Sequence, residues 1–549
     1  MTPRRLRAPA ADGGLLVDPH PGAVGQQVAA NAARLAEWDH DFQGRRAHRL
    51  REQVRREVLG LAGAFLSRHG LDGPASPAEA SRPSGRPLIV TGHQPELFHP
   101  GVWVKNFAAG AIAGARGGLA LNLIVDNDLP KGTSIRVPAR QGPDLRTERI
   151  DFDRWQGDIP YEDCDVADEA LFASFADRVR PVLAGAVADP VLEDYWPRAV
   201  RRRGEVDSLG LRLALARREL EASWGVSNLE VPLGAVCQTE GFLWFAAHLL
   251  AQLPRYQEIH NRCLAAYRAA HRIRSRNHPV AGLARQGEWL EAPFWVWRAG
   301  QPRRRGLWAR QRSRVLELRI GGEDQVLVEL PLTPDGEACC AVERLRDLPA
   351  QAVRLRTRAL TTTLFSRCLL GDLFLHGIGG AKYDELGDEI ARRYFGWEPP
   401  GFLTLSLTLW LNVPSDPASP AELASVNRRL RDLTFNPDRF LSEPIPDPVR
   451  NLIRVRRQAI AGPVTSHRQR IARRRTIRRC NEALQPWVQR LRVELTARQA
   501  RLQAGLRTDR IARSREFAFV LHSASRLRQI LRDVTAAFRS IDPPTAGPG

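Results

Sequence analysis

Three short segments of this chain combine glycine with histidine, carboxylate and lysine side chains, the residue types that bind and transfer charged groups. They are residues 91–106 (TGHQPELFHPGVWVKN), 125–134 (VDNDLPKGTS) and 376–385 (HGIGGAKYDE). Glycine lets the backbone approach a ligand closely, and the free N–H groups at a following helix start attract anions. The three segments therefore predict one functional site that binds phosphate or carboxylate groups.

The lysines of the chain are confined to these segments. Of the 81 basic residues, only Lys105, Lys131 and Lys382 are lysine, and each lies in a different segment. Arginine serves everywhere else, which indicates a coding bias toward arginine. Because a compact ammonium and a planar guanidinium are not interchangeable at a close anion contact, the three lysines are predicted to contact phosphate or carboxylate.

The first segment supplies two histidines, six residues apart, as candidate catalytic groups. His93 and His99 could donate to phosphate oxygens as charge develops in a transition state, although one of them could serve the structure alone. Two histidines without a third ligand at fixed spacing give little support for a metal, so no metal site is predicted. The segment also supplies candidates for contact with substrate or cofactor: Gly92, Gln94, Gly101, Lys105 and Asn106.

The second segment places three short polar side chains, Asp126, Asn127 and Asp128, directly after an apolar run. Such side chains at a strand end bind ribose hydroxyls, an amine or a divalent cation, and a plain turn is the alternative for each aspartate. Asp128 is the catalytic candidate, while Asp126 and Asn127 are substrate-binding candidates. Lys131 extends the loop and is predicted to close over the ligand.

The third segment repeats the design of a glycine loop that opens a helix. Its spacing matches neither the dinucleotide-binding nor the Walker pattern, so a phosphate cradle is a hypothesis here. Lys382 is the catalytic candidate because its ammonium could stabilise a leaving phosphate. Asp384 or Glu385 could act as a base or anchor an amine, and at least one of them is expected only to stabilise the helix start. The other candidates are His376, Tyr383 and Asp384 for substrate, and Gly377, Gly379 and Gly380 for a cofactor.

Apolar runs and helical patterns place these segments at the ligand edge of a parallel sheet. Strands are predicted at residues 87–90 and 119–125, with a helix at 103–115 between them. Strand, helix, strand is the order of neighbouring parallel strands, whose carboxyl ends carry the ligands of open α/β sheets. The predicted fold class is α/β, with a Rossmann-like parallel sheet core, inserted helical and small antiparallel β segments, and a C-terminal α-helical coiled coil.

Composition shifts and breaks in periodicity predict the domain organisation. In chain order the units are an N-terminal helical segment and linker (1–85), the first half of the core (86–150), a helical insertion (151–230), a core strand and helices (231–290), a small β insertion (291–345), the second half of the core with the glycine-rich loop (346–445), the coiled coil (446–538) and a disordered tail (539–549). The coiled coil, which predicts a homodimer, rests on apolar residues spaced mostly by three or four: Leu484, Trp487, Leu491, Leu495, Leu502 and Leu506.

A formal net charge of +20 raises the question of a polyanionic partner. Because arginine is enriched throughout and interleaved aromatic platforms are absent, we expect the arginine-rich helices to be a solvated face and do not predict nucleic-acid binding. The seven cysteines are odd in number and show no CxxC spacing, which predicts reduced thiols in the cytoplasm. The apolar stretch at residues 13–17 is too short for a signal sequence or a membrane span.

The first segment resembles the TGQQ-x-x-LF-x-GP-x-Y-x-x-x-K motif of the cysteine-adding enzymes of bacillithiol biosynthesis, the BshC-like cysteine ligases. Residues 126–128 resemble that family's acidic Glu-Asp-His-Asp motif, and residues 376–383 lie where the family has a glycine-rich Gly-Pro-Gly-Glu loop. The resemblance covers residues 87–535 and implies a core similar to that of class I aminoacyl-tRNA synthetases, with His93, Gln94 and His99 lining the catalytic pocket. The chain departs from the family's motifs at His93, Asn127 and Lys382. Since these positions are expected to face the substrate, the resemblance supports the family's fold more strongly than its substrate.

The expected function is a ligase that condenses an activated carboxylate, cysteine in the family, with the amine of another small-molecule substrate. ATP or ADP with Mg²⁺ is the expected cofactor. Two alternatives stay open: a non-catalytic nucleotide- or thiol-metabolite-binding protein that dimerises through its coiled coil, and an RNA-binding relative of the class I synthetases.

Overall fold

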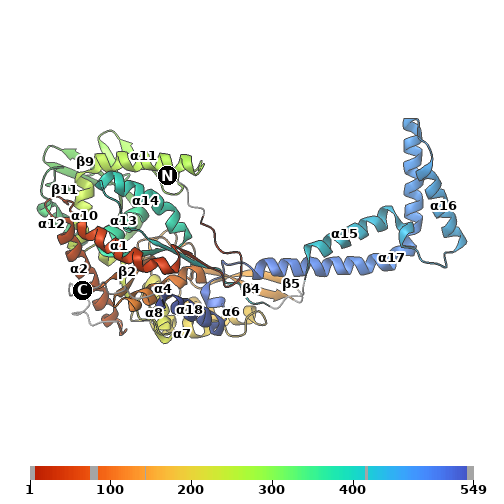
Figure 1. Cartoon of the computed structure of the whole chain (residues 1–549), viewed down its shortest axis with the longest axis horizontal. Coiled ribbons are helices and arrows are strands. Elements are labelled where there is room, and N and C mark those ends of the chain that lie inside the picture. Colours follow the sequence, from red (N-terminus) through yellow and green to blue (C-terminus); the bar gives the residue numbers. More distant parts are fainter. Residues whose placement is uncertain (1–5, 74–84, 142–143, 414–417, 541–549) are drawn as a thin grey trace, which may run out of the picture.

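The computed structural model of the chain describes residues 6–73, 85–141, 144–413 and 418–540. A body built around a six-stranded sheet carries a long helical arm that projects from one side (Figure 1). Most of the predicted linker at residues 73–85 and of the predicted tail at residues 539–549 lies outside the described residues, at 74–84 and 541–549.

The central sheet is mixed, and its middle strands are parallel. Its strands are β1 (Leu15–Asp18), β2 (Leu88–His93), β3 (Leu119–Ile124), β6 (Leu229–Pro232), β13 (Leu373–His376) and β14 (Leu403–Leu407). They lie in the order β1-β14-β13-β2-β3-β6, in which β1 runs antiparallel to β14 and all other neighbours are parallel. The chain order of the parallel strands reverses between β2 and β13, the kind of point where open parallel sheets hold ligands.

Both faces of the sheet are covered, because alternating side chains of β2 enter different cores. Leu88 and Val90 belong to one core, and Ile89 belongs to the other. The first core includes residues of α2 (Ala47–Arg68), α10 (Glu240–Ala251), α11 (Leu253–Ala270) and α14 (Ile378–Phe395), and the second includes residues of α1 (Val24–Glu37), α4 (Pro100–Ala115), α8 (Leu209–Ser223) and α18 (Ala524–Arg539). Burial on both faces explains why β2 and β3 are nearly continuous apolar runs.

Two of the predicted segments differ from the structure at the sheet. The N-terminal segment is not only helical, because β1 pairs with the free edge of β14. The core strand predicted in the unit at residues 231–290 begins before that unit: β6 is Leu229–Pro232, and the next four residues form α9 (Leu233–Val236). By contrast, the strands predicted at 87–90 and 119–125 and the helix predicted at 103–115 are confirmed by β2, β3 and α4.

The connecting segments form a hairpin, a helical layer and a second sheet. The hairpin of β4 (Ser134–Gln141) and β5 (Asp144–Asp151) is separate from the central sheet, so the first half of the core ends before residue 150. The helical layer contains α5 (Glu169–Ala173), α6 (Phe175–Leu183) and α7 (Leu192–Arg201). The second sheet is antiparallel and contains β7 (Arg285–Gln286), β8 (Trp289–Arg298), β9 (Gln301–Arg312), β10 (Val315–Ile320), β11 (Val328–Leu330) and β12 (Val353–Thr357).

Antiparallel strands lie within the predicted β insertion at residues 291–345 and continue beyond it on both sides. The last strand of the second sheet, β12, returns to pair with β8 after α12 (Cys339–Arg346), a long-range pairing that local periodicity cannot show. From β12 the chain passes through α13 (Ala359–Phe365) into β13 of the central sheet.

The arm consists of α15 (Pro420–Phe435), α16 (Asp447–Ala461) and the 46-residue α17 (His467–Ala512). Figure 1 shows α15 and α16 lying along α17, and α17 turning sharply toward its outer end. Pro486 lies within this helix and removes one of its backbone hydrogen bonds, which gives a physical reason for the turn. The predicted coiled-coil boundaries of 446–538 are wrong at both ends, because the arm includes α15 while α18 packs on α4 in the body.

The arm core follows the predicted leucine spacing with one shift. Leu484, Leu495 and Leu502 are buried, but Val488 is buried in place of Trp487, which is 53% exposed. Within the described residues, none of the helices combines the length and apolar character needed to cross a bilayer. All seven cysteines are free thiols, and five of them are buried.

Candidate functional site

A cavity of about 910 Å³ opens at the carboxyl ends of β2, β3 and β13. All three sequence segments contribute to its wall, although they lie up to 290 residues apart, from Gly92 to Lys382. Its size is that of a site for a nucleotide-sized ligand. The prediction that the three segments form one site is therefore consistent with their positions.

Most predicted site residues line this cavity. Of the catalytic candidates, His93, His99, Asp128 and Lys382 lie on its wall. The other predicted residues on the wall are Gly92, Gln94, Gly101, Lys105, Asn127, His376, Gly377, Gly379, Gly380 and Tyr383. Four candidates are absent from it: Asn106, Asp126, Lys131 and Asp384.

Asp126 and Asp384 are buried in the protein rather than presented to a ligand. Asp126 accepts a hydrogen bond from Gly234 N at 2.8 Å, and burial followed by the nearby Glu162 raises its pKa to about 7. Asp384 accepts from Arg367 Nη1 at 2.6 Å and from His376 Nε2 at 2.8 Å. Burial opposes ionisation of Asp384, but Arg367 and then His376 outweigh it and lower its pKa. Asp384 therefore orients His376 and does not act as a base.

Lys131 and Asn106 depart from the prediction in opposite ways. Lys131 is exposed outside the cavity, and its Nζ lies 2.9 Å from Glu96 Oε1. Asn106 is fully buried and links His93 on the cavity wall to Glu221 of α8. Its Nδ2 donates to Glu221 Oε1 at 2.7 Å, and its Oδ1 lies 3.1 Å from His93 Nε2. Lys131 thus lies outside the cavity and pairs with Glu96, and Asn106 positions His93.

His93 is held by the protein on both of its ring nitrogens. Nε2 faces Asn106 Oδ1, and Nδ1 lies 3.2 Å from the carbonyl oxygen of Gln94. Burial, followed by the Arg217 and Lys105 charges, lowers the pKa of His93 well below its ordinary value of 6.5. A neutral ring has one N–H and donates to only one of these two oxygens, but protein atoms lie against both of its nitrogens. His93 therefore shapes the cavity wall, and the geometry does not favour the predicted catalytic role.

His99 has the free donor that His93 lacks. It is the N-cap of α4, and its Nδ1 accepts a hydrogen bond from Gly101 N at 3.1 Å. Burial, followed by the Arg515 charge, lowers the pKa of His99 to about 3, so the ring is neutral and carries its proton on Nε2. The cap thus fixes the tautomer and leaves one N–H donor on the cavity wall.

Replacing His99 by alanine and by asparagine should separate its two roles. Both variants remove the Nε2–H donor, but asparagine can still cap α4, so we expect the alanine variant to be less stable than the asparagine variant by about 1 kcal/mol. Urea unfolding measures this difference. Equal stability of the two variants would show that the cap contributes nothing.

Lys105 lies at the buried end of the cavity. Its side chain is almost fully buried, and its Nζ donates to the carbonyl oxygen of Gly92 at 3.1 Å. Burial lowers the pKa of Lys105 to about 8, since no carboxylate lies beside it to stabilise the charge. An anionic ligand group in the cavity would supply that missing charge.

The start of α14 forms another part of the wall. Gly377 is its N-cap and provides no side-chain cap for the first N–H groups. A Cβ at Gly380 would lie 2.6 Å from His376 Nδ1, so glycine is required there by packing. A Cβ at Gly377 or Gly379 would meet no atom within 4 Å, so the protein itself does not require glycine at these two positions. Without side chains at Gly377 and Gly379, the backbone at the start of α14 is accessible from the cavity.

Arginine and threonine side chains from distant segments complete the wall, and the sequence analysis missed them. Arg304 of β9 donates to Asp128 Oδ1 at 2.9 Å, and Gln94 donates to Asp128 Oδ2 at 2.8 Å. Arg304 and Arg358 both lie over the Trp295 ring, with Cζ at 5.2 and 4.2 Å from its centroid. The remaining missed residues include Thr361, Thr362, Thr363, Ser406, Arg515 and Glu516.

The charge of the cavity is strongly positive. Its cations are Arg7, Lys105, Arg304, Arg358, Lys382 and Arg515, whereas Asp128 and Glu516 are its carboxylates. The Nε atoms of Arg358 and Arg515 are buried without a hydrogen-bond acceptor among the described residues. Part of the positive charge is balanced, because Arg304 pairs with Asp128 and Arg358 pairs with Glu291. The remaining cations favour a ligand that carries acceptor oxygens. Within the described residues, no group of three or more His, Cys, Asp or Glu side chains is arranged to hold a metal ion.

No protein-family model matches this chain, and no curated protein matches it. The function is therefore argued from the chemistry of the cavity.

Proposed function

We propose that this chain is a ligase that activates a carboxylate and condenses it with an amine in the cavity. The observation that carries this proposal is the convergence of six cationic side chains and the starts of α4 and α14 on one cavity, in which the carboxylates among the described residues are Asp128 and Glu516. Cations and free N–H groups stabilise the phosphate and carboxylate charges that such a reaction must gather in one place.

The strand order supports a Rossmann-type core. From one edge the parallel strands read β6-β3-β2-β13-β14, which is the doubly wound order with its reversal between β2 and β13. The cavity lies at the carboxyl ends of these two strands, where His93 and His376 end them. This position is the one that nucleotide-binding sheets of that type use.

The residues present fit a nucleotide. Gly377 and Gly379 leave space for a phosphate against the start of α14, and Lys382 and Arg358 can reach the same side of the cavity. Asp128 and Glu516 are the carboxylates that would hold Mg²⁺, with phosphate oxygens completing its ligands. Bound ATP would supply the group that activates the carboxylate.

Each side chain of the cavity is then assigned a role in the reaction. Lys105, Arg358 and Lys382 stabilise negative charge, and the Nε2–H of His99 donates to an oxygen that gains charge in the transition state. Asp128 is held by Gln94 and Arg304, which orients its carboxylate for the Mg²⁺ that it would hold. The main contribution to rate is then the orientation of two reactants in one cavity.

We further propose that the added group is cysteine and that the chain is a divergent relative of the bacillithiol cysteine-adding enzymes. The support is that the three segments carrying the resemblance lie on one cavity. At the divergent positions, His93 has both nitrogens occupied, and Asn127 donates to the Thr357 carbonyl oxygen at 2.9 Å. Since these two side chains bind protein atoms, Lys382 is the departure with most effect on substrate choice.

The proposed dimer and coiled coil depend on the arm. Within one chain, α15 and α17 pack through Val426, Leu433 and Leu495. Trp487 and Val493 remain more than half exposed on α17. We propose that a second copy covers these two side chains in a coiled-coil pairing, which analytical ultracentrifugation of Trp487→Arg would test by loss of the dimer.

Lys382→Ala is the central test of the ligase proposal, and Lys131→Ala is its matched control. Both lysines are exposed, but only Lys382 lines the cavity. A hydrogen bond to a charged group contributes about 1.5–3 kcal/mol, so we expect Lys382→Ala to bind ATP about tenfold to a hundredfold more weakly and to lose condensation of cysteine with glucosaminyl-malate. Thermal shift and product assays measure both effects, and the melting temperature without ligand should stay the same.

The control separates the outcomes. Lys131→Ala should retain wild-type binding and turnover. Equal losses in the two variants would assign the effect to general surface charge and reject the cavity as the site. Nucleotide binding that needs Lys382 but yields no product with any amine would favour the non-catalytic binding protein.

A further inference from the structure

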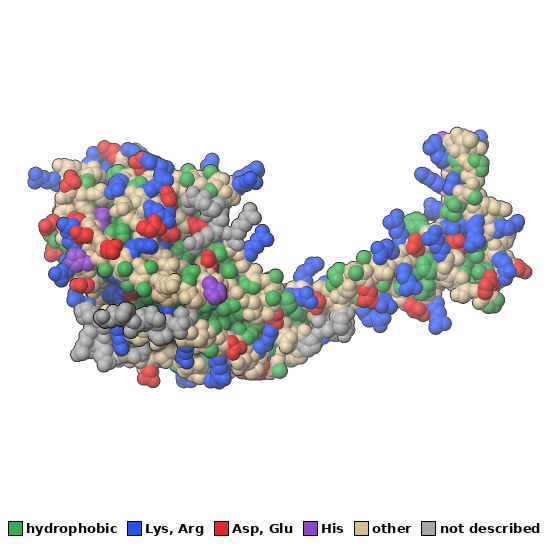
Figure 2. Space-filling model, in the orientation of Figure 1, with side chains coloured by type: hydrophobic (Ala, Val, Ile, Leu, Met, Phe, Trp, Pro, Cys, Tyr) green, Lys and Arg blue, Asp and Glu red, His purple; other side chains and the backbone are tan. Residues whose placement is uncertain are grey.

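The outer end of the arm, far from the cavity, is a second positively charged feature. We define the arm tip as α16 together with residues 467–482 of α17. Val449, Ile453 and Leu484 pack the two helices together, which makes the tip a helical hairpin. In Figure 2 the charged side chains at this end of the arm are mostly blue, the colour of Lys and Arg, and fewer are the red of carboxylates.

The charge of the arm tip does not follow from the composition of the chain. Residues 448–481 contain eleven arginines and no Asp or Glu, although the whole chain holds 61 carboxylates among 549 residues. A coding bias toward arginine accounts for the number of arginines, but it does not remove the carboxylates. The whole tip, as defined, adds two carboxylates, Asp447 and Glu482, so its eleven arginines leave it with a large positive charge.

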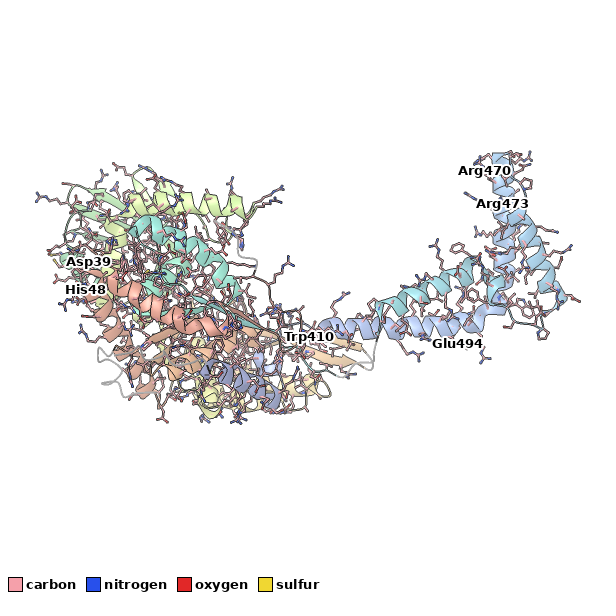
Figure 3. The ribbon with its side chains drawn as sticks, viewed as in Figure 1. Asp39, His48, Trp410, Arg470, Arg473 and Glu494 are labelled. Carbon is pink, nitrogen blue, oxygen red and sulfur yellow. The ribbon has the colours of Figure 1, made fainter. Side chains whose placement is uncertain are left out.

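Some arginines of the arm are paired with carboxylates, including Arg478 at the tip, which contacts Glu482. Arg490 contacts Glu494, and Arg513 contacts Asp509. At the tip, six guanidinium groups make no ion pair or hydrogen bond within the described residues: Arg468, Arg470, Arg473, Arg474, Arg475 and Arg479. Figure 3 shows Arg470 and Arg473 near the free end of the arm, whereas Glu494 lies further along it toward the body.

The spacing of these side chains fits a regular row of anions. Arg470, Arg474 and Arg478 follow each other at four-residue intervals, as do Arg475 and Arg479, so they form rows along one helix. From Arg468 to Arg479 the helix rises roughly 16 Å. A nucleic-acid duplex presents about one charge every 1.7 Å of its axis, and the guanidinium fork matches a phosphate group.

A membrane surface fits the tip less well. Insertion into a bilayer interface needs a continuous apolar face opposite the charged one. The large apolar side chains exposed at the tip are Ile460 and Ile471, at 41% and 40% exposure, and they lie on different helices. The other apolar residues of the tip hold the hairpin together.

We propose that the arm tip binds the phosphate backbone of a double-stranded nucleic acid. This inference goes beyond the ligase proposal and revises the expectation that the arginine-rich helices are only a solvated face. It does not depend on the cavity, because α17 separates the unpaired arginines at its start from Arg515, which follows its end. The partner would be held through charge and without base-specific contacts.

The test uses the full chain with a labelled RNA duplex and the DNA duplex of the same sequence, each about 20 base pairs. The tip variant carries Arg468→Gln, Arg470→Gln, Arg474→Gln and Arg475→Gln, all at positions without a partner. We expect it to bind at least about tenfold more weakly near 0.1 M salt, with a slope of log Kd against log salt reduced by about 2 or more. Fluorescence anisotropy measures both, and the tighter duplex identifies the natural class.

The matched control removes the same four charges from the body, with Arg146→Gln, Arg149→Gln, Arg274→Gln and Arg276→Gln at exposed positions. It should keep wild-type affinity and slope. Equal weakening in both variants, absence of duplex binding at low salt, or binding only to phosphatidylserine vesicles would each overturn the proposal. Turnover in the ligase assay should not change in the tip variant.

Discussion

Replacing Arg217 with alanine is expected to lower the free energy of unfolding by about 3–5 kcal/mol, because it leaves two buried carboxylates without their counter-ion. Arg217 donates to Glu221 Oε1 at 2.9 Å and to Glu230 Oε1 and Oε2 at 2.7 and 2.9 Å. All three side chains are almost fully buried. Urea unfolding near neutral pH measures the loss.

The pH dependence of the Arg217 variant gives a second measurement. Burial already raises the pKa of Glu230, although Arg217 opposes this rise. Without Arg217, Glu230 should be protonated in the folded state at a higher pH than in the unfolded state. A raised carboxyl pKa favours the folded state at low pH, so the deficit of the variant should shrink as the pH falls from about 8 to about 5.

Arg490→Ala is the matched control, because Arg490 pairs with Glu494 on the exposed surface of α17. Exposed pairs of this kind contribute roughly 0–1 kcal/mol. If Arg217→Ala were as mild as Arg490→Ala, the buried network would not stabilise the body. The network also reaches the cavity, since Glu221 accepts from Asn106, which faces His93. A damaged network should therefore weaken ligand binding as well.

The convergence of the three segments could be predicted from the sequence because it depends on one simple rule. Parallel strands end at the same edge of a sheet, however many residues separate them in the chain. The apolar runs before His93, Asp126 and His376 were recognisable as strands because both of their faces are buried. The rule can be applied without knowing the structure of the segments inserted between the strands.

The direction of individual side chains was harder to predict. Lys382 and Asp384 are two residues apart on α14, so they point to nearly opposite sides of the helix. Lys382 is exposed on the cavity wall, and Asp384 is buried against Arg367. Helical periodicity could have separated them. Asp126 and Asp128 lie in an irregular turn, where no such periodicity exists.

The arginines of the cavity could not be predicted from local sequence. Arg304 comes from β9 of the antiparallel sheet, Arg358 is the N-cap of α13, and Arg515 follows the arm, so only the tertiary fold brings them to the cavity. With 78 arginines in the chain, none of them stands out by type. Lysine was informative because it is rare in this chain, and two of the three lysines line the cavity.

Replacing Lys105 with methionine is expected to remove a pH dependence from the stability of the protein. The pKa of Lys105 is lowered by burial to about 8 in the folded state, whereas an unfolded lysine titrates near 10.5. The unfolded state therefore binds more protons between these values, so wild-type stability rises with pH across this window. From about pH 7 to about pH 9.5 the wild type should gain about 2 kcal/mol relative to Lys105→Met.

Urea unfolding of both proteins across this range measures the difference in their free energies of unfolding. The contributions of cysteines and tyrosines, which are the same in both proteins, cancel in this difference. Lys382→Met is the control, since it removes a lysine from the same cavity wall at an exposed position. A constant difference for Lys105→Met would show that Lys105 is not desolvated. An anion bound in the cavity should raise the pKa of Lys105, so binding of inorganic phosphate near pH 9 should take up a proton in the wild type and none in Lys105→Met.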